Sequence, residues 1–173
     1  MNTPVVFYRR LMWLYNHGIS ARHDNTGHMF ICQETEGTRG SNEVAASIYA
    51  FLKLVNCAQY DHIHSFSNCC GGQNRNKTMT TFFMLLFETT NIQSWTHTFL
   101  ESGHSYLTND TDFKKIQKNK DTNQSIFTKG EWTVIIKWCN FHDSEMQGRF
   151  YASAGLQRYR TNLQRYRTYR TIN

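Results

Sequence analysis

The order of strand and helix patterns in the middle of the chain constrains its fold more than any other feature. Residues 62–67, "HIHSFS", predict a short strand, and residues 92–100, "IQSWTHTFL", alternate large and small polar side chains as a strand does. The segment between them has helical spacing of its apolar residues, which are Met79, Phe82, Phe83, Leu86 and Phe87. A strand, a helix and a strand in this order require a parallel crossover, so we expect an α/β fold.

The flanking segments predict further elements of the same fold. Residues 5–19, "VVFYRRLMWLYNHGI", predict a long strand, and residues 28–33 predict a second strand that returns antiparallel after a turn at 23–27. Ser41 is expected to cap a helix that carries Glu43 in its first turn. The apolar stripe of this helix is Val44, Ile48, Phe51, Leu52 and Val55. Short helices are expected at "KKIQKNK" and at "GEWTVIIKWC".

Length and charge predict one domain followed by a basic tail. A chain of 173 residues with 14% aromatic residues and a single proline has the composition of one folded domain. From residue 147 onward there is no acid, and the arginines are Arg149, Arg158, Arg160, Arg165, Arg167 and Arg170. Without these six, the basic residues number 13 and balance the 13 acids. We therefore expect a domain at 1–146 and a disordered tail at 147–173, with the net charge of +6 in the tail.

The tail contains a tandem repeat, "LQRYRTN" followed by "LQRYRTY". Two heptads are too few to predict a coiled coil, so a solvated tail is the favoured interpretation. A nucleic-acid-binding arm is the alternative.

Cysteine usage and hydropathy favour an intracellular protein. The five cysteines have no spacing typical of a disulfide framework, which predicts free thiols. The chain opens without a charged and apolar leader, and runs such as "FFMLLF" are too short to cross a bilayer. We expect no membrane partner and no small-molecule substrate, and a nuclear location is left open.

The segment from His64 to Lys77, "HSFSNCCGGQNRNK", gathers polar groups where a strand turns into a helix. Gly71 and Gly72 permit close approach of the backbone, and the amides of a helix start attract anions. A phosphate site and a tight, capped turn both account for this pattern. The candidate nucleic-acid contacts here are Gln73, Asn74, Arg75 and Lys77. Their alternative is ordinary solvation, as it is for the lysines of residues 114–120.

Several segments together resemble a family of uncharacterised, transposase-derived proteins. The resemblance covers roughly residues 4 to 138. The segments that carry it are "VVFYRRLMWLYNHGI", "ETEGTRGSNEVAAS", "SNCCGGQNRNKTM", "FLESGHSYLTNDTDF" and "EWTVII". That family resembles the catalytic core of cut-and-paste transposases, which implies an RNase H-like mixed sheet flanked by helices.

The resemblance implies a metal site that this chain has largely lost. Such cores hold two Mg²⁺ ions with three carboxylates and cleave a DNA phosphodiester. Asn68 stands where the family has its second carboxylate, while Asp110, with Asp112 as second choice, matches the third, and His104 would orient the site. The first carboxylate lies upstream of the segment matching "VVFYRR". We therefore expect no cofactor, or Mg²⁺ at most at a residual site, and no phosphodiester chemistry.

The same resemblance implies that the first, central strand of the sheet is missing. Two interior strand edges are then open, and either the flanking strands close the gap, another chain fills it, or the fold is poorly stable. The partners expected are DNA and a related full-length chain. The function expected is that of a truncated, inactive transposase-like domain, and the alternative is a non-enzymatic nucleic-acid-binding module that uses the tail.

The side chains of the corner include two other candidate sites, a zinc site and a cysteine nucleophile. His62, His64, Cys69 and Cys70 do not have the spacing of a closed zinc site, so buried thiols and edge histidines are the favoured interpretation. A cysteine nucleophile paired with His104 lacks an orienting partner in the sequence. His104 is equally well explained as a loop histidine that satisfies backbone groups.

Overall fold

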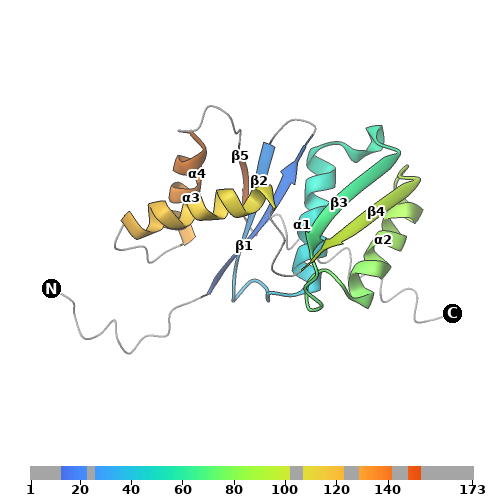
Figure 1. Cartoon of the computed structure of the whole chain (residues 1–173), viewed down its shortest axis with the longest axis horizontal. Coiled ribbons are helices and arrows are strands. Elements are labelled where there is room, and N and C mark those ends of the chain that lie inside the picture. The colour runs from blue at the N-terminus through green and yellow to red at the C-terminus, as the bar shows by residue number, and fades with distance from the viewer. Residues whose placement is uncertain (1–12, 23–25, 102–106, 123–128, 142–147, 153–173) are drawn as a thin grey trace.

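The computed structural model describes residues 13–22, 26–101, 107–122, 129–141 and 148–152. Its elements form two small sheets and their covering helices (Figure 1). In chain order they are β1 (Leu14–Ala21), β2 (Thr26–Gln33), α1 (Ser41–Leu54), the 3₁₀ helix η2 (Cys57–Gln59), β3 (His62–Asn68), α2 (Lys77–Thr89), β4 (Ser94–Leu100), α3 (Thr108–Thr122), α4 (Lys129–Phe141) and β5 (Gly148–Ala152).

The first sheet is built on the predicted antiparallel pair. β1 and β2 pair from Leu14 opposite Gln33 to Ala21 opposite Thr26, which confirms the prediction, although residues 5–12 lie outside the described part of the chain. β5 then adds to β2 in parallel, with Gly27 opposite Gly148. β5 was not predicted, and it falls within the segment assigned to the tail. Residues 153–173, with the tandem repeat, lie outside the described residues.

The second sheet contains the predicted parallel crossover. β3 and β4 are parallel, with α2 between them in sequence, so the α/β class is confirmed. The described strands form two separate sheets, in the order β1-β2-β5 and β3-β4, so the expected RNase H-like sheet is not confirmed. No described strand joins β1 to β3.

Helices cover both faces of the first sheet. On one face α1 approaches, and the rings of Phe51 and His28 meet edge to face with centroids 4.9 Å apart. The other face carries α3 and α4. The buried residues there are Met29, Ile31, Ile116, Ile135 and Ile136. Gly18 permits this packing, because a Cβ at that position would lie only 3.1 Å from the Phe113 ring of α3.

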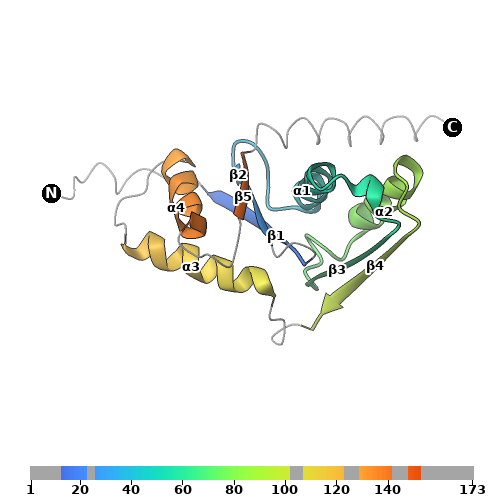
Figure 2. The ribbon, with the colours of Figure 1, turned by 90° about the horizontal axis from the view of Figure 1, so that it is seen from above.

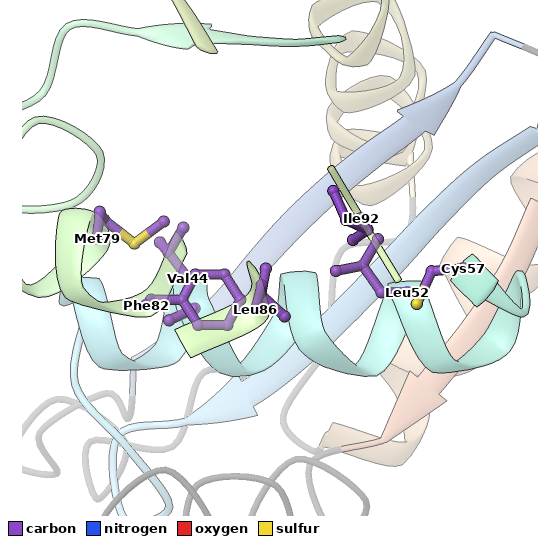
Figure 3. Packing of buried hydrophobic residues seen from close by; sticks show 8 residues of the cluster. Val44, Leu52, Cys57, Met79, Phe82, Leu86 and Ile92 are labelled. Atoms are coloured by element: carbon purple, nitrogen blue, oxygen red, sulfur yellow. The ribbon is translucent and has the colours of Figure 1, made fainter. Parts of the chain in front are cut away.

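A second core joins α1 to α2 and the β3–β4 sheet (Figure 3). Its buried members are Val44, Ala45, Leu52, Cys57, Met79, Phe82, Leu86 and Ile92. Since α1 contributes to this core and also covers β2, it connects the two sheets and lies between them in both ribbon views (Figures 1 and 2). The predicted face of α2 is partly wrong, because Phe87 is 40% exposed while Leu86 is 1% exposed.

The start of α1 differs from the prediction. The N-cap is Gly40 and no side chain caps the helix, so Ser41 is its first residue and not its cap. Glu43 instead reaches back, and its carboxylate accepts hydrogen bonds from the backbone N–H of Thr38 (3.1 Å) and from the Thr38 hydroxyl (3.3 Å). The acid in the first turn therefore fixes the preceding loop as well as facing the positive end of the helix dipole.

None of the helices among the described residues combines the length and apolar character needed to cross a membrane.

Candidate functional site

The corner between β3 and α2 is a tight turn that satisfies its own backbone. The carbonyl oxygen of Cys70 accepts from the backbone N–H groups of Gln73 (3.2 Å), Asn74 (2.8 Å) and Arg75 (3.1 Å). These three amides therefore point into the turn. They are not presented together to a phosphate, as the sequence alone allowed.

Asn76 closes the start of α2. Its Oδ1 accepts from the backbone N–H of Met79 at 3.1 Å, and its Nδ2 donates to the carbonyl of Gly71 at 3.0 Å. One side chain thus satisfies a free helix amide and holds the glycine segment against the helix. The residues of the corner therefore supply hydrogen bonds that stabilise this geometry.

Asn68, the residue at the expected carboxylate position, is exposed, and a hydrogen bond from Asn74 holds its side chain. Asn74 Nδ2 donates to Asn68 Oδ1 at 2.6 Å and approaches the Asn68 carbonyl at 3.2 Å. The one side-chain oxygen that could face a cation is therefore already engaged with an amide. A metal ion would have to displace that hydrogen bond to use it.

The basic residues of the corner lie beside this pair. Arg75 Nη1 donates to the Cys69 sulfur at 3.4 Å, and its guanidinium lies 6.0 Å from the centroid of the Phe99 ring. Arg75 and Lys77 are exposed, and Gln73 is half-buried. Of the four residues that the sequence assigned to nucleic-acid contact, Gln73, Asn74 and Arg75 lie in the turn and Lys77 is the first residue of α2.

The expected third carboxylate lies on α3, whose first turn is fastened to β1. Asn109 Nδ2 donates to the carbonyl of Gly18 at 2.7 Å, and Asn109 Oδ1 accepts from the Ser20 hydroxyl. Asp110 Oδ2 accepts from the backbone N–H of Leu107 at 2.9 Å, so this carboxylate closes the helix start. Asp110 therefore has a structural partner in Leu107, the residue just before its helix.

Asp112 is buried, with 5% of its surface exposed, and faces β2. Its Oδ2 lies 3.3 Å from the place where a Cβ on Gly27 would stand. His104 lies outside the described residues. Among the residues that are described, no three His, Cys, Asp or Glu side chains gather as metal ligands would, and this includes the zinc alternative at His62, His64, Cys69 and Cys70.

A hydrogen-bonded relay between β3 and β4 was not foreseen from the sequence. The Trp95 indole N–H donates to Ser65 Oγ at 2.6 Å, and the same hydroxyl lies 2.6 Å from His97 Nδ1. On the other side of the ring, His97 Nε2 lies 2.9 Å from Ser67 Oγ, and the Ser67 hydroxyl donates to the carbonyl of Asn68 at 3.0 Å.

Only one neutral form of His97 satisfies every member of this relay. Since the indole donates to Ser65, the Ser65 hydrogen is free to point at Nδ1, and Nε2–H then donates to Ser67. Burial lowers the pKa of His97, in agreement with a neutral ring. In this form Nε2 has no lone pair for the Ser67 proton, so the relay does not activate Ser67 as a nucleophile.

Part of this relay was visible in the sequence. The alternation of "SWTHTF" placed Trp95 and His97 on one face of a strand. Their serine partners depend on the register that sets Ser65 opposite His97, and nothing local in the sequence fixes that register.

Comparisons of the chain with protein-family models, with curated proteins and with solved structures found no match. The transposase-like resemblance therefore rests on the motifs themselves.

Proposed function

We propose that this chain is a catalytically inactive domain of the transposase-derived type, which keeps an α/β scaffold and lacks the means to hold two metal ions. The observation that carries the proposal is the Asn68–Asn74 hydrogen bond of 2.6 Å at the end of β3. It occupies the position where the resembled family has a carboxylate.

The chemistry of the available oxygens supports this proposal. Mg²⁺ binds one or two carboxylates with near-octahedral geometry, and a neutral amide oxygen brings no charge to attract it. Losing one anionic ligand about 4 Å from a dication weakens the attraction by about 8 kcal/mol at an effective dielectric constant of about 20. The residues present do not fit a pair of Mg²⁺ ions, because Asn68 is neutral, Asp110 already accepts the backbone N–H of Leu107 and Asp112 is a single buried acid.

Calorimetric titration with Mn²⁺ tests the proposal directly. We expect no binding heat for the unmodified chain and none, or only millimolar binding, for Asn68→Asp. The matched control is Asn74→Asp, which places the same charge on the other member of the pair. Micromolar binding by the unmodified chain, or metal-dependent cleavage of a DNA duplex that disappears in Asp110→Ala, would contradict the proposal.

A non-enzymatic nucleic-acid-binding module is the second candidate. The observation that favours it is the exposure of Arg75 and Lys77 at the same corner, together with the arginines beyond residue 147. In this case the corner supplies contacts to phosphates and the arginines supply most of the attraction.

A further inference from the structure

Within the described part of the chain, no strand pairs with the outer edge of β4, and β4 itself carries none of the residues that protect a strand edge. Among the described residues β4 pairs with β3 alone. Its sequence, "SWTHTFL", contains no Lys, Asp, Glu or Pro. Edge strands of stable proteins normally contain such residues or are covered by another element, because their unpaired N–H and C=O groups can otherwise pair with a strand of another chain.

The hydrogen bonds with β3 show which backbone groups of β4 face outward. The Ser94 N–H donates toward β3, to the carbonyl of Asp61 at 3.1 Å. Because successive residues of a strand point their backbone groups to opposite sides, the groups of Thr96 and Thr98 also face β3. The N–H and C=O groups of Trp95, His97 and Phe99 therefore point to the open edge.

The helix above this edge is apolar on the same side. Phe83 of α2 packs on the rings of Trp95 and His97, with centroids 4.8 Å and 5.5 Å apart. Phe87 and Met84 follow Phe83 around the helix by roughly 40° and 100°, on the flank opposite Phe82. They are 40% and 51% exposed, whereas Phe82 faces the core shared with α1. The outer flank of α2 thus continues the unprotected edge of β4.

The inner edge of the same sheet is less accessible. β3 lies between β4 and the β1–β2–β5 sheet, and β4 is the outermost strand in both ribbon views (Figures 1 and 2). A large partner therefore reaches β4 more readily than β3.

We propose that the outer edge of β4 pairs with β4 of a second copy of this chain, antiparallel and about a twofold axis at His97. In this register Trp95 lies opposite Phe99 of the second copy, and Thr96 lies opposite Thr98. Every residue with outward backbone groups meets another such residue, and no charges are opposed. Aromatic and threonine pairs of this kind stabilise antiparallel ladders.

The pairing also extends the two-stranded sheet of the monomer and covers apolar side chains that the monomer exposes. A two-stranded sheet becomes a four-stranded one, and sheets of three or more strands are more stable than an isolated pair. The two α2 helices come to lie side by side on one face, where Met84 and Phe87 of each copy are covered. A twofold, self-complementary interface is the commonest arrangement of soluble oligomers.

The test combines mass measurement with residue-resolved hydrogen exchange on the full chain. Analytical ultracentrifugation should show a dimer that dissociates on dilution. In the dimer the amides of Trp95, His97 and Phe99 should exchange slowly, and on dilution they should become fast while those of Thr96 and Thr98 stay protected. This alternation is specific to pairing through the β4 edge and needs no mutation.

A charge variant gives a second readout. Thr96→Lys/Thr98→Lys places like charges opposite each other, and we expect dimerisation to weaken by about tenfold or more. The matched control is His64→Lys/Phe66→Lys, on the cross-strand partners of these threonines in β3, which should leave the dimer intact. A monomer at all concentrations, protection that does not alternate along β4, or dissociation by the control variant would overturn the proposal.

Discussion

The side-chain amide of Asn74 is hydrogen-bonded to Asn68 Oδ1 across the turn that follows β3, at 2.6 Å. The side-chain oxygen of Asn68 is thus engaged by a neutral amide. This hydrogen bond shows why the corner is well formed although it lacks a carboxylate: the polar side chains that suggest a ligand site are used to hold the turn. The predictions below test how far such internal bonding accounts for the fold.

Asn76→Ala should destabilise the protein by about 1 to 2 kcal/mol. The substitution leaves the Met79 amide without its cap and the Gly71 carbonyl without its donor. Chemical denaturation followed by circular dichroism measures the change. Lys77→Ala, at the neighbouring exposed position, is the control and should change the free energy of unfolding by less than about 0.5 kcal/mol.

Ser65→Ala should cost more stability than Ser67→Ala. Loss of the Ser65 hydroxyl leaves both the Trp95 indole N–H and His97 Nδ1 unpaired, whereas loss of Ser67 leaves only His97 Nε2–H. Each unpaired, half-buried group costs about 1 to 3 kcal/mol. Denaturant midpoints of the two variants give the comparison, and equal or reversed effects would show that the relay is wrongly assigned.

His17 should make stability depend on pH between about 6.5 and 4. Burial lowers the pKa of His17 to about 4, and its Nδ1 has no hydrogen-bond partner among the described residues. As the pH falls below 6.5, the unfolded chain takes up a proton that the folded chain refuses, so the free energy of unfolding decreases. The full loss is on the order of 3 kcal/mol.

The pH effect can be assigned with two variants. His17→Leu should flatten the fall in stability over this pH range, as measured by denaturation at several pH values. His64→Gln, at an exposed position of β3, should keep the slope of the unmodified chain. An unchanged slope in His17→Leu would mean that other groups cause the effect.

Removal of residues 153–173 should abolish most of any DNA binding, with the strand β5 left in place. The deletion takes away the arginines Arg158, Arg160, Arg165, Arg167 and Arg170. Fluorescence anisotropy with a duplex probe should show an affinity that falls steeply with salt in the full chain. Lys114→Gln/Lys118→Gln on the exposed side of α3 is the control, and a tail deletion without effect would refute the second candidate function.

Local patterns in the sequence predict most of the elements. The alternation in "SWTHTF" and the apolar spacing around Met79 correspond to β4 and α2, and the expected antiparallel return corresponds to the pairing of β1 with β2. These features depend on side-chain periodicity and turn chemistry, which neighbouring residues determine.

Features that depend on distant residues were not predictable in the same way. β5 pairs with β2, which lies more than a hundred residues earlier in the sequence. Its own segment, "GRFYA", is too short for a strand to be predicted from it. The capping of α1 through Glu43 and the serine partners of His97 likewise require loop geometry and strand register. At the corner, the sequence singled out Asn68, Asn74 and Arg75 but could not show that Asn74 donates to Asn68 and Arg75 donates to the Cys69 sulfur.

The parallel pairing of Gly27 with Gly148 has a consequence for synthesis of the chain. A ribosome must deliver the chain through β5, at residues 148–152, before β2 acquires its second neighbour, whereas β3, α2 and β4 emerge within about forty residues of one another. The β3–β4 half can therefore form early, and the first sheet must wait with one side of β2 uncovered. Nascent chains released before residue 148 would be the species most prone to aggregate.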